Sequence, residues 1–307
     1  MHIYLPIAEL SANAFGLLLL GGVAGVLSGL FGIGGGFILT PMLIFMDVPP
    51  AVAVATSANM IIASSFSGFL SHMKHKRVDT QIGNFLVAGG MIGVLMGVWF
   101  FAQMKRAGQL DLTISLLYVF LLGSIGFLTA REAWHLYLAR QRGEVQHNHG
   151  HLQLPAWVDR LPWQRDFSRS QVHYSALIPI ALGVLSGVLV SLLGVGGGFI
   201  MIPAMYYILR MPSTVTVGTS LYQIIFITAA ATLLHAVTTH SVDIVLAALL
   251  LIGSAIGAQW GVRWSHRIPT HILRASMAAL LILMVLRLAY GLFITPEELF
   301  TFTIRTD

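Results

Sequence analysis

The chain has 307 residues, of which 56% are hydrophobic and only 9% are charged, with 31 Gly and no Cys. A soluble domain carries about a quarter charged residues, so most of this chain does not face water. The composition excludes a soluble enzyme, a disulfide-linked scaffold and a disordered protein, and without thiols there are no cysteine nucleophiles or cysteine metal sites. Continuous rather than alternating apolar runs argue against an outer-membrane barrel. What remains is an all-α integral membrane protein.

The net charge of +5 does not indicate nucleic-acid binding, because the positive side chains lie mostly in short loops between apolar runs. Charge in such loops sets membrane orientation. The N-terminus carries Glu9 where a cleavable signal peptide has Lys or Arg, so we expect the first apolar run to be retained as a span.

The apolar runs form two groups of five, and the second member of each group is short for a full span. The first group covers residues 12–31, 36–46, 51–71, 82–103 and 112–138. The second group covers residues 174–193, 198–209, 213–235, 244–264 and 271–293. Since a span takes about 20 apolar residues, we expect about 8–10 membrane segments. The predicted units are a first membrane repeat (1–138), a cytoplasmic polar linker (139–172) and a second membrane repeat (173–307).

The two groups are copies of one another. Residues 32–38, GIGGGFI, match residues 194–200, GVGGGFI, at an offset of 162. With one residue inserted at each of two later places, the match continues through Pro41 and Pro203, Thr56 and Thr219, Ser57 and Ser220, His72 and His235, and Asp79 and Asp243. Abundant Gly does not by itself produce ordered Thr-Ser, His and Asp matches, so we predict an internal duplication.

Each half is predicted to be a Gly-broken helical hairpin followed by three transmembrane helices. Because each half then crosses the membrane an odd number of times, the halves should have inverted topology. This arrangement places most loop charge on one side: Lys74, Lys76, Arg77, the linker arginines, Arg210, Arg263 and Arg267. The other side has Lys105, Arg106 and Arg305. The first side, with the linker, is therefore predicted to be cytoplasmic, and both termini periplasmic.

The two Gly clusters are the strongest candidates for a functional site. They comprise Gly32, Gly34, Gly35 and Gly36 in the first half, and Gly194, Gly196, Gly197 and Gly198 in the second. Consecutive Gly residues can break a helix, and irregular backbone within a bilayer is tolerated only where protein buries it or it lines a cavity. Each break frees N–H groups at the start of the next helix, which favour a small anion.

Glycines elsewhere in the spans are predicted to allow close helix packing instead. They are Gly21, Gly25, Gly89, Gly93 and Gly97, with their mates Gly183, Gly187, Gly253, Gly257 and Gly261.

Neutral polar side chains follow each Gly hairpin and are candidate substrate ligands. They are Thr56, Ser57 and Asn59 in the first half, and Thr219, Ser220 and Gln223 in the second. Residues three or four apart share a helix face, so these groups could line one surface. The alternative is that the hydroxyls bond within their own helices or join neighbouring helices.

Several ionisable residues admit two interpretations. His72 and His235 end equivalent spans, either as proton-coupling groups or as residues at the membrane boundary. Asp79 and Asp243 are predicted helix caps. His147, His149 and His151 in the linker could collect a metal, although a polar loop needs none, and we predict no metal site and no cofactor. There is no nucleotide-binding Gly-x-x-x-x-Gly-Lys-Ser/Thr loop to indicate ATP coupling.

The hairpins GVLSGLFGIGGGFILTPML and GVLVSLLGVGGGFIMIPAM, each followed by a Thr-Ser-bearing span, resemble the TauE/SafE sulfite exporter family of membrane transporters. The resemblance covers nearly the whole chain apart from the linker and the extreme termini. It implies a bacterial inner-membrane protein that moves sulfite, sulfonates or related organosulfur anions.

The predicted function is a secondary transporter that exports such an anion by alternating access. The alternatives are an anion channel and, with less support, an intramembrane enzyme, for which no paired catalytic groups stand at depth. The expected partners are a small anionic substrate and the lipid bilayer; the sequence gives no oligomeric state.

Overall fold

The computed structural model describes residues 2–31, 35–141, 162–167, 170, 172–209, 211–265, 268 and 270–293. The helices of the first half are α1 (Ala14–Phe31), α2 (Gly36–Phe45), α3 (Pro50–Lys74), α4 (Thr80–Arg106) and α5 (Leu110–Gln141). Those of the second half are α6 (Leu177–Leu193), α7 (Gly198–Tyr207), α8 (Ser213–Thr238), α9 (Ile244–Ser265) and α10 (Thr270–Phe293). Both halves thus have the same order of helices, including the predicted short second helix.

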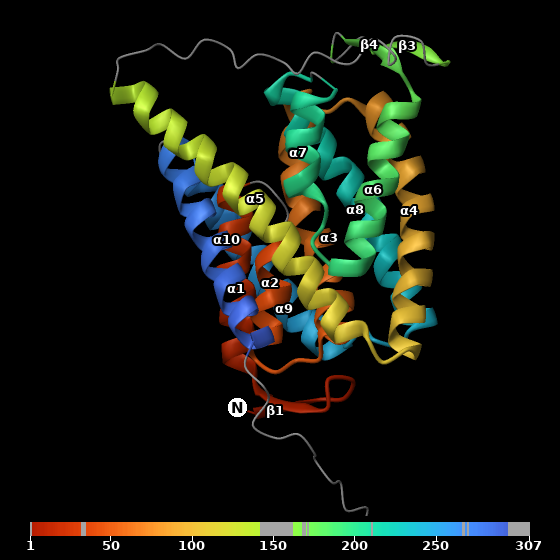
Figure 1. The fold of residues 1–307 in the computed structure, drawn as a ribbon, viewed down its shortest axis with the longest axis vertical. Coiled ribbons are helices and arrows are strands. Elements are labelled where there is room, and N and C mark those ends of the chain that lie inside the picture. Colours follow the sequence, from red (N-terminus) through yellow and green to blue (C-terminus); the bar gives the residue numbers. More distant parts are fainter. Residues whose placement is uncertain are drawn as a thin grey trace, which may run out of the picture.

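A two-stranded antiparallel hairpin precedes the helices of each half. The first consists of β1 (His2–Leu5) and β2 (Leu10–Asn13), and the second of β3 (Gln164–Phe167) and β4 (Val172–Ser175). The bounds of the two hairpins differ by 162 residues, the offset of the Gly clusters. The second hairpin straddles the predicted boundary between the linker and the second repeat at residue 172. The two hairpins lie at opposite ends of the helix bundle (Figure 1).

Two pairs of helices approach so closely that only Gly fits between their backbones. Along α1 and α9, a Cβ atom added to Gly21 would lie 2.7 Å from the Leu250 carbonyl oxygen. Along α4 and α6, Gly93 faces the backbone of Val184 in the same way. The packing role predicted for the glycines of these spans is therefore confirmed.

The two halves also contain equivalent cores. One buried cluster includes Leu5, Leu39, Leu43, Val48, Val52, Leu246 and Leu250. The other includes Phe167, Met201, Met205, Met211, Val215, Ile82 and Leu86, which are their counterparts by the sequence offsets. In each core the residues named come from a hairpin, from the second and third helices of one half and the connection between them, and from the fourth helix of the other half.

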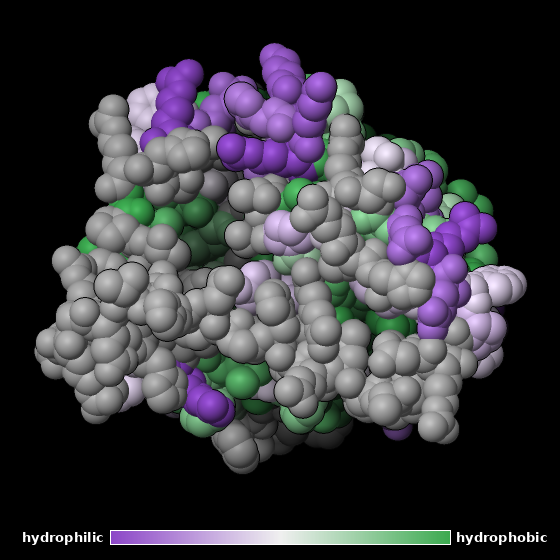
Figure 2. Space-filling model, turned by 90° about the horizontal axis from the view of Figure 1, so that it is seen from above, coloured by the Kyte–Doolittle hydropathy of each residue, from purple (hydrophilic) through white to green (hydrophobic). Residues whose placement is uncertain are grey.

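Within the described residues, six helices are long and apolar enough to cross a membrane: α1, α3, α4, α5, α8 and α9. Large apolar side chains cover the outside of the bundle, among them Phe120 (75% exposed) and Ile244 (77%). Figure 2, which looks onto the end that carries β3 and β4, shows hydrophilic side chains on this end and hydrophobic ones around its flanks. An apolar flank between polar ends is the surface of a protein that spans a bilayer.

Candidate functional site

Both Gly clusters break the chain between two helices. Gly35 is the N-cap of α2 with φ 66°, and Gly197 is the N-cap of α7 with φ 67°. Side chains rarely adopt this left-handed conformation, so Gly is needed at both positions. Gly32 and Gly34 lie outside the described residues.

The two breaks meet in the interior. A Cβ atom added to Gly36 would lie 2.6 Å from the Gly194 carbonyl oxygen, so the two halves touch backbone to backbone here. The Ile61 side chain of α3 lies against Gly36 and Gly196, on both sides of this contact. Gly194, Gly196, Gly197 and Gly198 are buried, as are Gly35 and Gly36. The structure thus brings together the two predicted clusters.

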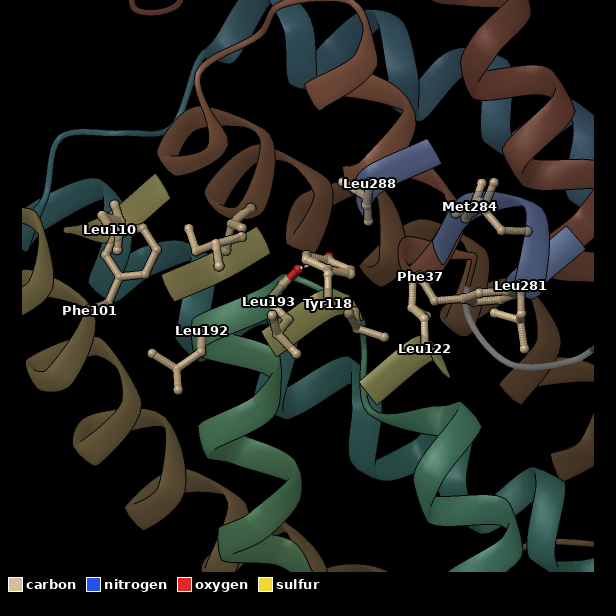
Figure 3. Close-up of a cluster of buried hydrophobic side chains, with 14 residues drawn as sticks. Phe37, Phe101, Leu110, Tyr118, Leu122, Leu192, Leu193, Leu281, Met284 and Leu288 are labelled. Atoms are coloured by element: carbon tan, nitrogen blue, oxygen red, sulfur yellow. Dashed lines mark hydrogen bonds between the residues drawn. The ribbon is translucent and has the colours of Figure 1, made fainter. Parts of the chain in front are cut away.

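An apolar cluster surrounds the meeting point, with side chains from α2, α5, α6 and α10 (Figure 3). Phe37 follows directly after Gly36, and Leu193 directly precedes Gly194. The buried Tyr118 of α5 points into this cluster and donates its hydroxyl proton to the Leu193 carbonyl oxygen. A carbonyl left without a helical partner where α6 ends is thereby satisfied.

The polar candidates differ in what their side chains bond. The Ser220 hydroxyl donates to the Val217 carbonyl of its own helix, as the alternative interpretation predicts. Ser57 and Gln223 are fully buried, and their side-chain polar atoms have no partner within the described part of the chain. Asn59 is half-buried. Ser57 and Gln223 are therefore the candidates with hydrogen-bonding capacity to offer a ligand.

Thr56 and Thr219 join the two halves. The Asp243 backbone N–H donates to the Thr56 hydroxyl oxygen at 3.2 Å, and the Asp79 N–H donates to that of Thr219 at 2.9 Å. Both threonines are buried. Each bond runs from the third helix of one half to the N-cap of the fourth helix of the other. Contact of these two hydroxyls with substrate stays a prediction.

The capping role predicted for Asp79 and Asp243 is confirmed. One carboxylate oxygen of Asp79 accepts the backbone N–H of Gln81 and of Ile82, and Asp243 caps α9 in the same way. The second oxygen of each carboxylate holds a hairpin. That of Asp243 accepts the N–H of Ile7 and of Ala8 between β1 and β2, at 3.0 and 3.4 Å.

The second hairpin is held by the side chain of Ser170, which donates to the Asp79 carboxylate at 2.6 Å. Tyr174 of β4 is buried close by, and burial together with the Asp79 charge raises the pKa of its hydroxyl, so it is protonated at neutral pH. We call these two arrangements the Asp79 clasp and the Asp243 clasp. Each ties a hairpin to the first turn of a helix from the other half.

The two candidate histidines have different surroundings. Both ring nitrogens of the buried His235 have partners: the Ser191 carbonyl at 2.9 Å and the Thr239 hydroxyl at 3.3 Å. Its ring also lies edge-on to Phe101, with ring centroids 4.6 Å apart. His72 is only partly buried, next to Gly218 of α8. Proton coupling stays a prediction for both.

No group of three or more His, Asp or Glu side chains able to hold a metal occurs among the described residues. His147, His149 and His151 lie outside these residues.

Sequence reasoning missed Tyr118, Ser170 and Ser186. The Ser186 hydroxyl of α6 lies against Gly197 and has no partner among the described residues. No sequence signal marks the hairpins, because residues 2–13 and 164–175 share no identical residue at the offset of 162. Tyr118 and Ser186 have no such signal either, since each stands in a predominantly apolar span.

The fold and site define a multi-pass membrane protein in which two Gly-broken helical hairpins meet in the interior. Residues 17–288 match the family described as Sulfite exporter TauE/SafE. The chain belongs to this family of membrane transporters.

Relatives match over most of the chain. A probable membrane transporter protein of Bacillus subtilis, YunE, is 26% identical over 287 residues, which are 90% of this chain and 98% of that protein. A second from the same organism, YjnA, is 27% identical over 280 residues, 89% and 98% of the two chains. Sulfite exporter TauE/SafE family protein 3 of Arabidopsis thaliana is 29% identical over 125 residues, 40% of this chain and 25% of that protein. No solved structure gives a significant match.

Proposed function

We propose that this chain is a secondary transporter that exports sulfite, a sulfonate or a related small organosulfur anion across the bacterial inner membrane. The observation that carries the proposal is the contact of Gly36 with Gly194, which brings the start of α2 against the break between α6 and α7 in the interior. A helix begins at each break, and the positive end of its dipole together with the N–H groups of its first turn favours an anion. The family description supports a sulfur oxyanion as that anion.

Alternating access requires two halves that can rock against each other around a fixed site, and an inverted repeat supplies them. Three observations support inversion. The hairpins lie at opposite ends of the bundle (Figure 1). The α1–α9 and α4–α6 contacts are counterparts under the sequence offsets, and so are the positions of the two clasps. The loop charges also gather on one side when the halves are inverted.

Neutral side chains complete the proposed site. Ser57 and Gln223 contribute hydroxyl and amide groups, and Asn59, Thr56, Thr219 and Ser220 line the approach to it. Neutral groups bind an anion more weakly than a fixed Arg or Lys does, which suits a substrate that must be released on the other side. The burial of all the described site residues except Asn59 favours a carrier in an occluded state over an open channel.

Flux measurements on the purified chain in proteoliposomes test the proposal. Radiolabelled sulfite, sulfate and methanesulfonate are compared side by side, and we expect saturable flux of sulfite or of the sulfonate. Preloading with unlabelled substrate should accelerate uptake of label, because a carrier shows counterflow and a channel does not. Saturable flux that ignores an imposed pH gradient would remove the role of His72 and His235 in proton coupling.

Two substitutions test the Gly site itself. Gly35→Ala and Gly197→Ala place a Cβ in a left-handed backbone conformation, against Ser28 and Ser186 respectively. We expect each to reduce flux strongly. Gly16→Ala in α1 is the control, because its added Cβ would have only Asn13 at 3.8 Å. Full transport by folded Gly35 and Gly197 variants would contradict the proposed site.

A further inference from the structure

The equivalent cores of the two halves differ in polarity at two positions. Where the first half has Ala24 and Met60, the second has Ser186 and Gln223. Ser186 is 2% exposed and Gln223 is 0% exposed. The Ser186 hydroxyl and both amide atoms of Gln223 have no hydrogen-bond partner in the part of the chain that the structure describes. Buried polar atoms without partners destabilise a fold, so two such side chains in the second half, at positions that are apolar in the first, point to a ligand.

Ser186 places its hydroxyl at the start of α7. A Cβ atom added to Gly197, the N-cap of this helix, would overlap the Ser186 oxygen. The hydroxyl therefore faces the N-terminal end of a ten-residue helix, where the dipole is positive. The counterpart of Ser186, Ala24, has no polar side-chain atom to offer to α2.

Gln223 lies in the same region. Its counterpart Met60 is buried in one cluster with Ala24 and Leu39. Ser186 is the residue equivalent to Ala24, and Met201 is the residue equivalent to Leu39, so the repeat places Gln223 near both. One turn beyond Gln223, Ile227 lies against Gly90 of α4, and Gly183 and Gly187 of α6 pack against the same glycine. The α8 face that carries Gln223 and the α6 face that carries Ser186 thus converge on one stretch of α4.

Resting on the proposed transport function, we infer that the substrate binds off the centre of the repeat, between Ser186, Gln223 and the start of α7, and that it is an oxyanion carrying a hydrogen-bond donor. The Ser186 hydroxyl and the Gln223 amide nitrogen donate to anion oxygens. The Gln223 amide oxygen can only accept, so the ligand must donate a proton to it. This argument holds for either orientation of the amide, because both of its atoms lack a partner.

The inference separates chemically similar anions. Hydrogen sulfite is a monoanion with a proton to donate. Methanesulfonate has the same charge and a similar shape but carries a methyl group in that place. Fully deprotonated sulfite and sulfate have only acceptor atoms, which leave the Gln223 oxygen unpaired and facing another acceptor. A ligand that lacks the matching hydrogen-bonding group leaves a buried polar group of the site unpaired, and this cost weakens its binding.

The test exchanges the residues between the halves. Gln223→Met with Ser186→Ala gives the second core the residues of the first, and Met60→Gln with Ala24→Ser is the matched control. Two measurements use the full chain: the ligand-dependent rise in melting temperature in detergent, and competition with radiolabelled sulfite flux in proteoliposomes. Hydrogen sulfite, in mildly acidic buffer, and methanesulfonate are the probes.

We expect the wild type to prefer hydrogen sulfite to methanesulfonate by about tenfold, the effect of one or two hydrogen bonds. The Gln223/Ser186 variant should lose this preference and, without ligand, melt at a higher temperature because it no longer buries unpaired polar atoms. The control should melt at a lower temperature and keep the preference.

Two outcomes overturn the inference: an unchanged preference in the Gln223/Ser186 variant, or an equal loss in the control. If that variant keeps the preference while the wild type still carries sulfite, the inference fails and the proposed function stands. If hydrogen sulfite raises the melting temperature but none of the anions is transported, the proposed function fails and the binding site stands. If no anion changes either readout, both fail.

Discussion

The hydroxyl oxygens of Thr56 and Thr219 accept backbone N–H groups at the N-caps of α9 and α4. We expect Thr219→Val to destabilise the protein by about 1–3 kcal/mol, because it leaves the buried Asp79 N–H without an acceptor. Thermal unfolding in detergent measures the effect. Ser220→Ala is the control, because that hydroxyl bonds only within its own helix. Equal loss of stability in both variants would show that the bond to Asp79 is not the cause.

Adjacent glycines of α1 provide a second test at single residues. A Cβ atom added to Gly21 would lie 2.7 Å from the Leu250 carbonyl oxygen, whereas at Gly22 the nearest atom would be 3.8 Å away. We expect Gly21→Ala to destabilise the protein by about 1–3 kcal/mol, because backbone must shift to admit the methyl group. Gly22→Ala should be neutral or slightly stabilising, since Ala favours the helix. Similar melting temperatures for the two variants would contradict the close packing of α1 and α9.

At the scale of elements, we expect the two clasps to respond differently when their Asp is replaced by Asn. The second Asp243 oxygen accepts two backbone N–H groups, whereas the second Asp79 oxygen accepts a hydroxyl. Asn still caps a helix. At position 243, however, the NH₂ group of the Asn would face the N–H groups of Ile7 and Ala8, which are donors too. At position 79 the Ser170 hydroxyl can rotate and accept a hydrogen bond from the NH₂ group of the Asn.

Asp243→Asn should therefore release the β1–β2 hairpin, and Asp79→Asn should leave the β3–β4 hairpin in place. Hydrogen exchange followed by mass spectrometry measures this through the peptides that cover residues 2–13 and 162–175. We expect faster exchange in residues 2–13 of the Asp243 variant alone. Unchanged exchange there would mean that the carboxylate does not hold the hairpin.

The helices could be predicted from sequence because each is a continuous apolar run bounded by polar residues, and the Gly-x-Gly-Gly-Gly repeat marked both breaks. The hairpins could not be predicted, because their four-residue strands are stabilised by a carboxylate that is distant in the sequence. No residue pattern within residues 164–175 indicates that contact. The roles of Thr56 and Thr219 were hidden for a related reason. A hydroxyl in a span has the same sequence pattern whether it faces a substrate or the backbone of another helix.

At the scale of the whole molecule, the proposed orientation follows from charge. Lys74 ends α3 and Arg263 lies in the last turn of α9, at the end of the bundle that carries the Asp79 clasp. Lys105 and Arg106 end α4 at the other end, where the Lys105 ammonium group donates to the Thr239 carbonyl. The excess of positive charge, to which the linker arginines add in the sequence, predicts that the β3–β4 end faces the cytoplasm.

Because the chain has no Cys, single cysteines report this orientation without a background signal. His75 and Ala107 are both exposed, in the connections that precede and follow α4. We expect a membrane-impermeant maleimide to label Ala107→Cys in intact cells and to label His75→Cys only after permeabilisation. The reverse pattern would place the linker outside. Labelling of both in intact cells would contradict a full crossing by α4, and with it the odd number of crossings per half on which inversion depends.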